Sequence, residues 1–257
     1  MKLICPVCGK PLHNHEKSAV CPDRHTFDYS AGGYLNLALN KSDLHGDSKE
    51  MTAARTAFLN TGAYGPLRDE IVRIMEECAP ETTVDLCCGE GSYTACLPGT
   101  EKYGIDLSKP ALKYASRRDR GTLYILASAF RVPLEDHCAD CILTCFAPVA
   151  EEEIKRLLRP GGTFIYVTGG PDHLFELKSL LYEHPYRNEE TDPVRMLRIM
   201  DTIELTYPFR ADHDALLNLF AMTPYAYRTG NEGKQRIAAA DHLDITAQFT
   251  IRIYKAV

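Results

Sequence analysis

The sequence contains no apolar run long enough to cross a bilayer, and no basic and then apolar leader precedes its first cysteine. Both absences favour a protein that stays inside the cell. Disorder is not indicated, because 45% of the 257 residues are hydrophobic and 25% are charged, both near the averages of globular proteins. A positive electrostatic field over the whole molecule is not indicated either, because the formal net charge is -6. A nucleic acid would therefore have to meet a local basic patch. We expect a folded cytoplasmic chain with room for one medium core and a small appended module.

Two signatures of other protein classes are also missing. The fingerprint GxGxxG of dinucleotide-binding proteins is absent from the glycine-rich segment VDLCCGEGSYT, residues 84–94, and Glu90 lies in that loop, where it would repel a phosphate. A disulfide framework is disfavoured because a reducing cytoplasm keeps thiols open. The ten cysteines therefore indicate free thiols and metal ligands.

The amino terminus gathers four soft metal ligands in two pairs. The segments CPVC and CPDRH place twelve residues between the pairs, a spacing typical of a tetrahedral zinc site whose four positions are all filled by protein. Such a closed shell leaves no position for a substrate, so the metal is expected to be structural. About thirty residues bury too little apolar surface to fold without such a staple. The expected ligands are Cys5, Cys8, Cys21 and His25, with His13 and His15 as alternatives that fit the spacing less well.

The segment 84–94 has the pattern of a strand, a tight turn and the start of a helix. The predicted strand ends at Asp85, and Gly89 and Gly91 make the turn. A second predicted strand, KYGID, ends at Asp106, 21 positions after Asp85, where a carboxylate can accept hydrogen bonds from both hydroxyls of a ribose. With the phosphate fingerprint missing, this indicates a nucleoside ligand without phosphates, of which S-adenosylmethionine is the common one. Asp85 has an alternative role, the orientation of the glycine loop through backbone hydrogen bonds.

Further strands are predicted at residues 122–127, 138–145 and 162–168, with helical stretches between them, including EEEIKRLLRP before Gly161. This alternation predicts an α/β fold with a mostly parallel sheet. The C-terminal run DITAQFTIRIY alternates apolar and polar residues and suits an antiparallel strand at the edge of such a sheet. The segment RNEETDPVRMLRIM, residues 187–200, has the composition of a charged helix.

Four segments resemble the ordered motifs of class I S-adenosylmethionine-dependent methyltransferases: VDLCCGEG, the acidic GID, CFAP at 145–148 and LLRPGG at 157–162. The resemblance covers roughly residues 60–170. It implies a Rossmann-like, mostly parallel seven-stranded sheet that binds S-adenosylmethionine. Enzymes that share these motifs act on very different substrates, so the motifs do not identify the substrate.

The chain as a whole resembles the bacterial 23S ribosomal RNA guanine-N1 methyltransferases, the family of RlmA and the tylosin-resistance enzyme. The matching segments are CPVC with CPDRH, GGYLNL at 32–37, GDSKEMTAAR at 46–55, AYGPLRD at 63–69, GPDHLFELK at 170–178 and MTPYAYR at 222–228. The resemblance implies methyl transfer to N1 of a guanine splayed out of a 23S RNA hairpin, by a homodimer, and leaves antibiotic resistance open. The sequence departs from the family at Cys87, where glycine is more usual, and at Tyr227, where tryptophan is expected.

The resemblance also assigns site residues. The expected cofactor residues are Tyr64, Gly89, Glu90 and His173 from the family pattern, and Asp85, Gly91 and Asp106 from the general motifs of the class. Tyr225 and Tyr227 are expected to stack on the extruded guanine. No side chain is identified as the acceptor of the N1 proton. As alternatives, Tyr64 would be an ordinary core tyrosine and His173 a helix cap.

We expect three parts in the chain: a zinc-binding module for RNA recognition over residues 1–36, a connecting segment with a helix over 37–60, and the methyltransferase domain over 61–257. Basic side chains gather at two places, and each group is either an RNA contact or a solvated face. These residues are Lys113, Arg117, Arg118 and Arg120, and then Arg195 and Arg198.

Two other functions compete with RNA methylation. A methyltransferase for a small molecule, such as a quinone or a polyketide precursor, agrees with the isoelectric point near 5.9, but it would not need the zinc module. A non-enzymatic binding module would be favoured by loss of Gly89, Gly91 or Asp106, and all three are present. Cys138 and Cys141 copy the spacing of a metal knuckle but have no second pair, so buried free thiols are expected there.

Overall fold

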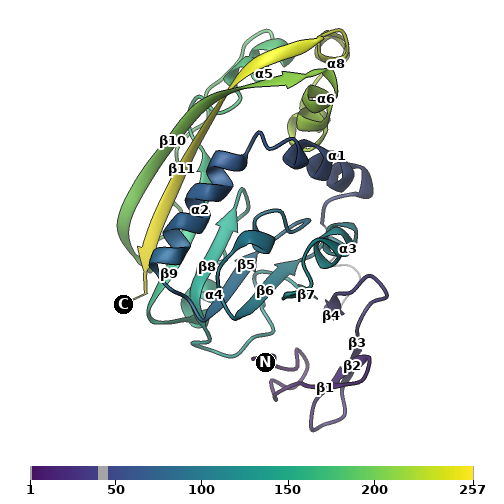
Figure 1. Cartoon of the computed structure of the whole chain (residues 1–257), viewed down its shortest axis with the longest axis vertical. Coiled ribbons are helices and arrows are strands. Elements are labelled where there is room, and N and C mark those ends of the chain that lie inside the picture. The colour runs from purple at the N-terminus through teal and green to yellow at the C-terminus, as the bar shows by residue number, and fades with distance from the viewer. Residues whose placement is uncertain (1, 40–45, 257) are drawn as a thin grey trace.

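The computed structural model describes residues 2–39 and 46–256; residues 40–45, part of the predicted connecting segment, lie outside this description. Two sheets organise the described chain (Figure 1). A small three-stranded sheet lies near the amino terminus, and an eight-stranded sheet runs through the rest, with helices on its faces. No described helix is both long and apolar enough to span a membrane.

The amino-terminal residues form an antiparallel ribbon of short strands. Its strands are β1 (His13–His15), β2 (Ser18–Val20) and β3 (Thr26–Asp28), paired in that order. Two turns carry the predicted zinc ligands. Gly9 N donates to Cys5 O at 2.8 Å in the first, and Arg24 N donates to Cys21 O at 2.9 Å in the second. Gly9 and Arg24 have φ angles of +72° and +65°, the left-handed conformation that lets the chain reverse sharply.

The large sheet has five parallel and two antiparallel strand pairs among the described residues. Its order is β10-β11-β9-β8-β5-β6-β7-β4. The strands are β4 (Leu35–Asn36), β5 (Thr82–Leu86), β6 (Glu101–Asp106), β7 (Thr122–Leu126), β8 (Ala139–Cys145), β9 (Leu158–Gly169), β10 (Arg198–Asp212) and β11 (His242–Lys255). The predicted α/β fold is confirmed. The eighth strand is β4, which follows the ribbon and pairs with β7.

Three of the described helices begin at a side chain that caps the first turn. The Ser48 side chain accepts a hydrogen bond from Met51 N at the start of α1, and the Ser108 side chain accepts one from Ala111 N at the start of α3. The helices are α1 (Lys49–Asn60), α2 (Gly65–Glu77), α3 (Lys109–Arg118), α4 (Glu151–Leu157), α5 (Phe175–Leu181), α6 (His213–Ala221), α7 (Tyr225–Arg228) and α8 (Asn231–Ala238). In Figure 1, α6 and α8 lie at the upper end of the long β10–β11 hairpin, and the ribbon lies at the lower end of the molecule.

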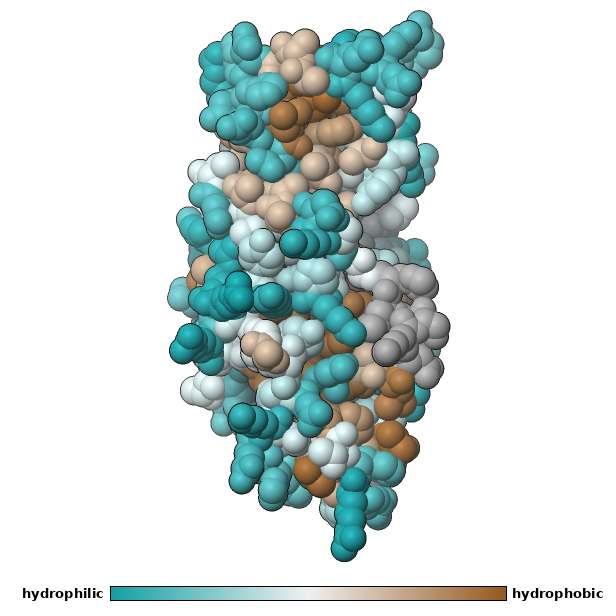
Figure 2. Space-filling view, turned by 90° about the vertical axis from the view of Figure 1, so that its right-hand side faces the viewer, coloured by the Kyte–Doolittle hydropathy of each residue, from teal (hydrophilic) through white to brown (hydrophobic). Residues whose placement is uncertain are grey.

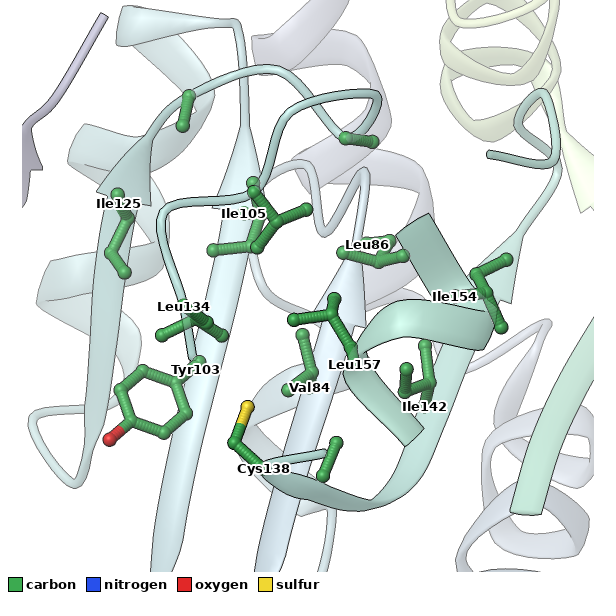
Figure 3. Packing of buried hydrophobic residues seen from close by; sticks show 14 of the residues in the cluster. Val84, Leu86, Tyr103, Ile105, Ile125, Leu134, Cys138, Ile142, Ile154 and Leu157 are labelled. Carbon is green, nitrogen blue, oxygen red and sulfur yellow. The ribbon is translucent and has the colours of Figure 1, made fainter. Parts of the chain in front are cut away.

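Alternate residues of the central strands pack into cores on opposite faces of the sheet. In β8, Ile142 joins the cluster that contains Ile154 and Leu157 of α4, whereas Leu143 joins the cluster that contains α2 and α5. Figure 3 shows the two α4 side chains packed over strand residues of the first cluster. Leu3 of the ribbon belongs to the same cluster. The ribbon therefore helps α4 to cover one face of the sheet.

Three local predictions were wrong. β11 does not lie at the edge of the sheet, because β10 pairs with its outer side. β10 was missed because it contains Pro208 and has no buried residue before Ala211, features that an exposed edge strand tolerates. The predicted charged helix at 187–200 is absent, and β10 begins at Arg198 instead. After the glycine loop, a short 3-10 turn (Thr94–Cys96) replaces the expected helix.

Candidate functional site

A cavity of about 400 Å³ opens at the edge of the large sheet where the central parallel strands end. Its walls come from the segments that follow β5, β6, β7 and β8, and from α1 with the residues just before it. The chain runs from β5 outward to β6 and β7 and then returns to β8 on the other side of β5. In open α/β sheets, ligands bind at such a switch point. Four of the seven predicted cofactor residues line the cavity: Asp85, Gly89, Glu90 and Asp106.

The loop after β5 is held by the Asp106 carboxylate. Asp106 Oδ2 accepts a hydrogen bond from Gly89 N at 2.9 Å, and Oδ1 accepts one from Ser108 N at 2.7 Å. Burial raises the pKa of Asp106, while both N–H groups and the nearby Arg55 favour its ionised form. Each carboxylate oxygen keeps a further lone pair for a ligand hydroxyl. The geometry therefore leaves Asp106 able to accept from a ribose.

Asp85 is buried at the end of β5 and accepts a hydrogen bond from Thr94 Oγ1 at 2.6 Å. The pKa of Asp85 is raised to about 7, mainly by burial; the Thr94 hydrogen bond opposes this rise, and the neighbouring carboxylates of Asp106 and Glu90 add to it. Asp85 thus joins the two ends of the glycine loop through a side-chain contact. Its proton equilibrium lies close to neutral pH, so a cation in the cavity would favour the ionised form.

Two buried polar atoms in the cavity wall, Glu90 Oε1 and Tyr93 Oη, have no hydrogen-bond partner among the described residues. Glu90 is 2% exposed, and a buried carboxylate oxygen without a partner is costly unless a bound group donates to it. The described wall also carries three more carboxylates and a single guanidinium, that of Arg55, which pairs with Asp47. This charge balance favours a cationic ligand with hydrogen-bond donors. S-adenosylmethionine fits, because it offers a sulfonium, an ammonium and two ribose hydroxyls.

Tyr64 and His173 lie against each other, next to the cavity but not in its lining. Tyr64 Oη and His173 Nε2 are 3.2 Å apart, and His173 Nδ1 accepts a hydrogen bond from Gln248 N at 3.2 Å. Burial lowers the pKa of His173 to about 3, so the ring is neutral, and with Nδ1 accepting, Nε2 carries the proton toward Tyr64. The His173 ring lies nearly parallel to Phe146, at 15° with ring centres 6.3 Å apart. Phe146 itself lines the cavity.

Gly91 also lies outside the cavity lining. Its φ angle is +77°, and a Cβ at this position would be 2.8 Å from Tyr124 Oη and 2.9 Å from Ala115 Cβ. Gly91 therefore allows the loop to pack directly against α3 and β7, which positions the adjacent Glu90.

Tyr225 and Tyr227 lie on α7, and neither lines the cavity. Tyr225 packs edge-on against Tyr182, with ring centres 6.3 Å apart, while Tyr227 is 74% exposed. The structure thus separates the predicted stacking residues from the four predicted cofactor residues that line the cavity.

Sequence reasoning missed several residues of the cavity wall. Asp47 and Arg55 belong to GDSKEMTAAR and Phe146 to CFAP, so the resemblance marked their segments without assigning the residues. Phe130 lies in the connection between β7 and β8, and a single apolar residue in a loop carries no pattern that would single it out.

The ribbon brings the four predicted zinc ligands together, with ligand atoms all within 4.8 Å of one another. Tetrahedral bonds of about 2.3 Å to sulfur and about 2.0 Å to nitrogen require S–S separations of about 3.8 Å and S–N separations of about 3.5 Å. Cys8 Sγ and Cys21 Sγ are 3.7 Å apart, and His25 Nδ1 lies 3.5 Å from Cys5 Sγ and 3.3 Å from Cys21 Sγ. The cluster fits zinc. The alternative ligands His13 and His15 are exposed on β1 instead.

The second cysteine pair is not a metal site. Cys138 packs on one face of the large sheet and Cys141 on the other, and both are buried free thiols. Among the described residues, only the ribbon cluster has metal-ligand geometry.

A basic groove of about 720 Å³ lies between the end of the ribbon and α3. Its lining includes Lys49, Lys109, Lys113 and Arg117, together with Tyr34 and Tyr114. None of these four cations forms an ion pair with another described residue. Figure 2, which views the right-hand side of Figure 1, shows mostly hydrophilic residues across the middle of this face, at the height of α3.

The groove and the cofactor cavity share two walls. The segment with Asp47 in the cavity continues to Lys49 in the groove, and Leu107 in the cavity is followed by Lys109 in the groove. A neighbouring hollow extends from Arg117 past the end of α3 and is lined by Asp119 and Arg120. The basic groove therefore lies next to the cavity that the cofactor would occupy.

Comparison with known proteins covers both sheets. A zinc-ribbon family described as "RlmA, N-terminal" matches residues 3–39, and a family described as "Methyltransferase domain" matches residues 84–166. The 23S rRNA (guanine(748)-N(1))-methyltransferase of Streptomyces fradiae is 34% identical over 251 residues, which span 92% of this chain and 90% of that protein.

Two further proteins extend the comparison. YxjB of Bacillus subtilis, provisionally named a 23S rRNA (guanine-N(1)-)-methyltransferase, is 29% identical over 269 residues, which span 97% of this chain and 95% of YxjB. The crystal structure of YcgJ from Bacillus subtilis matches with a TM-score of 0.52 at 16% identity, over 73% of this chain and 97% of YcgJ. YcgJ therefore shares the fold of the larger domain.

Proposed function

Since this chain belongs to the family of 23S rRNA (guanine-N1)-methyltransferases and is an S-adenosylmethionine-dependent enzyme, we propose that it methylates N1 of a guanine in a 23S RNA hairpin. The observation that carries the proposal is the basic groove that joins the zinc ribbon to the cofactor cavity. A methyltransferase for a small molecule would need neither the ribbon nor unpaired cations beside it. The overall charge of -6 is compatible with RNA because the positive charge is local.

The proposed cofactor residues act in two layers. Asp85, Gly89, Glu90 and Asp106 line the cavity, and Tyr64, Gly91 and His173 support that wall. When bound, S-adenosylmethionine supplies a methyl group on a positively charged sulfur that leaves as a neutral thioether. Asp106 accepts from the ribose, Glu90 Oε1 accepts from a cofactor donor, and the carboxylates offset the positive charge. Because a neutral leaving group needs little acid catalysis, alignment of the guanine is the main task of the protein.

We further propose that residues 1–36 recognise the RNA, that 37–60 connect, and that 61–257 carry out the transfer. Arg131 Nη2 donates to Pro6 O at 3.1 Å, and Lys2 Nζ donates to Cys138 O at 3.2 Å, so the ribbon is tied to the catalytic part at several points. On the family relationship alone, we propose a cytoplasmic homodimer. Gel filtration with light scattering would contradict the dimer if the mass were that of one 28.8 kDa chain.

The proposed reaction is tested with labelled S-adenosylmethionine and unmodified 23S RNA. Nuclease mapping and nucleoside analysis should recover the label as 1-methylguanosine at one hairpin. Asp106→Asn should lose labelling together with cofactor affinity, whereas Lys155→Glu, an exposed change on α4 away from the cavity, should keep both. Absence of RNA label while cofactor binding is intact would contradict the proposal and favour a small-molecule substrate.

A further inference from the structure

We propose that Phe130 and Phe146 form the stacking site for the guanine extruded from the RNA, an inference that rests on the proposed function. Both side chains line the cofactor cavity, and they are 61% and 46% exposed. Among the described residues of the cavity wall, these are the only large hydrophobic side chains left exposed. Aromatic rings at the entrance of a cavity offer flat apolar faces on which an unstacked base can lie.

Phe146 has a strained backbone conformation that its surroundings hold in place. Its φ angle is +55°, a left-handed conformation that costs a bulky residue free energy and persists where the surroundings enforce it. Phe146 N donates to Val167 O at 3.0 Å, which anchors the residue at the end of β8. The ring lies nearly parallel to His173 and also contacts Phe249, with ring centres 5.8 Å apart. The Phe146 ring is therefore supported from inside the fold while nearly half of it remains open.

Phe130 stands on a tight turn between two buried residues. Ala129 and Val132 are buried, and Phe130 N donates to Ser128 Oγ at 3.2 Å. This turn leaves the ring exposed at the cavity wall. The next residue, Arg131, donates to the carbonyl of Pro6, which lies between two zinc ligands. The position of Phe130 is thus coupled to the ribbon that is proposed to hold the RNA.

The assignment differs from the stacking residues expected from the family pattern. Tyr225 and Tyr227 are outside the cavity lining, on α7, whereas N1 of the guanine has to reach the methyl group inside the cavity. A ring at the entrance meets that requirement directly, because stacking there places the edge of the base toward the interior.

The test measures single-turnover methylation by the zinc-loaded full chain, at saturating cofactor and saturating RNA, on the hairpin mapped with the wild type. Phe146→Ala and Phe130→Ala should each slow transfer by about 5- to 150-fold, the range expected for loss of one base–aromatic stack. Affinity for S-adenosylmethionine, measured by calorimetry, should change by less than about threefold, as expected for groups that stack on the base. Phe146→Tyr keeps the ring and should restore most of the rate. Ile199→Ala is the matched control, since Ile199 is equally exposed, at 48%, but lies on β10.

A second readout uses RNA with 2-aminopurine in place of the target guanine. The chain contains no tryptophan, so emission from the probe is not overlaid by indole. Stacking should quench the bound probe in the wild type, and Phe146→Ala should relieve that quenching.

The outcomes separate this inference from the function on which it rests. If the wild type labels no RNA, the proposed function and the stacking site both fail. If the wild type forms 1-methylguanosine while both alanine variants keep its rate, only the stacking site fails. A loss of rate matched by an equal loss of cofactor affinity would also overturn it, because the rings would then belong to the cofactor pocket. Slow transfer in Tyr227→Ala with normal transfer in the phenylalanine variants would move the stack to α7.

Discussion

Replacement of Gly91 by alanine tests whether the glycine loop is shaped by packing. A left-handed backbone costs an L-residue about 1–2 kcal/mol. The added Cβ would also lie 2.8 Å from Tyr124 Oη and 2.9 Å from Ala115 Cβ, an overpacking that costs about 1–3 kcal/mol. Gly91→Ala should therefore lower the free energy of unfolding by about 2–5 kcal/mol. Gly161 is the matched control, because its φ angle is +75° but a Cβ added there would have open space around it, with no atom within 4 Å; Gly161→Ala should cost about 1–2 kcal/mol.

The assay is urea and thermal unfolding followed by circular dichroism. In a chain of this size, each kcal/mol shifts Tm by about 2–4 °C, so the two variants should be resolved. Tyr124→Phe removes the closer contact, and alone it should be nearly neutral because Tyr124 Oη has no hydrogen-bond partner in the described chain. Gly91→Ala should cost less in that background. Equal destabilisation by Gly91→Ala and Gly161→Ala would refute the packing argument.

Three further predictions concern charge and metal. Relative to Asp85→Asn, the wild type should lose up to about 4 kcal/mol of stability as pH rises from 3.8, the ordinary pKa, to about 7, the folded pKa. Stability falls with rising pH because the folded chain favours the neutral carboxyl of Asp85. If urea unfolding gave the same stability difference between wild type and Asp85→Asn at every pH, this prediction would be wrong. Cys5→Ser with Cys8→Ser should weaken RNA methylation but leave cofactor affinity largely intact; loss of cofactor binding would indicate a purely folding role. Lys113→Glu with Arg117→Glu should raise the KM for RNA and reduce its salt slope by about 2, with Lys155→Glu as the control; unchanged RNA binding would contradict the proposed groove.

The sequence predicts those parts of the fold that depend on local pattern. The short β5 ends next to a glycine-rich loop, and β8 contains the apolar run CIL, so the parallel sheet could be anticipated. The acidic side of the cavity could be anticipated too, because β6 ends at the carboxylate of Asp106. β10 was not anticipated, although Ile203, Leu205 and Tyr207 alternate with polar residues and pack partly buried against the core. Pro208 in the same run weakens the strand pattern, and the pairing with β11 is set only by the fold.

In the candidate site, too, some features follow from local sequence pattern and others arise only from the fold. The zinc ligands follow from spacing alone, because each pair occupies one turn. Phe130 and Asp47 reach the cavity from segments that are far apart in the chain. No local sequence pattern predicts that these two segments lie side by side. The basic groove likewise combines the end of the ribbon with α3, so the clustered charges on α3 acquire a partner surface only after folding.

The short strand β4 bears on attempts to transplant the ribbon between relatives. Leu35 and Asn36 are already part of the catalytic sheet, in register with Ile125 and Leu126 of β7, and Ser108 Oγ donates to Asp47 O at 2.8 Å. A graft that ended at residue 36 would carry foreign side chains into that sheet edge. A chimera designed to change RNA specificity should therefore join before Tyr34, so that the recipient keeps its own edge strand and its own cavity wall.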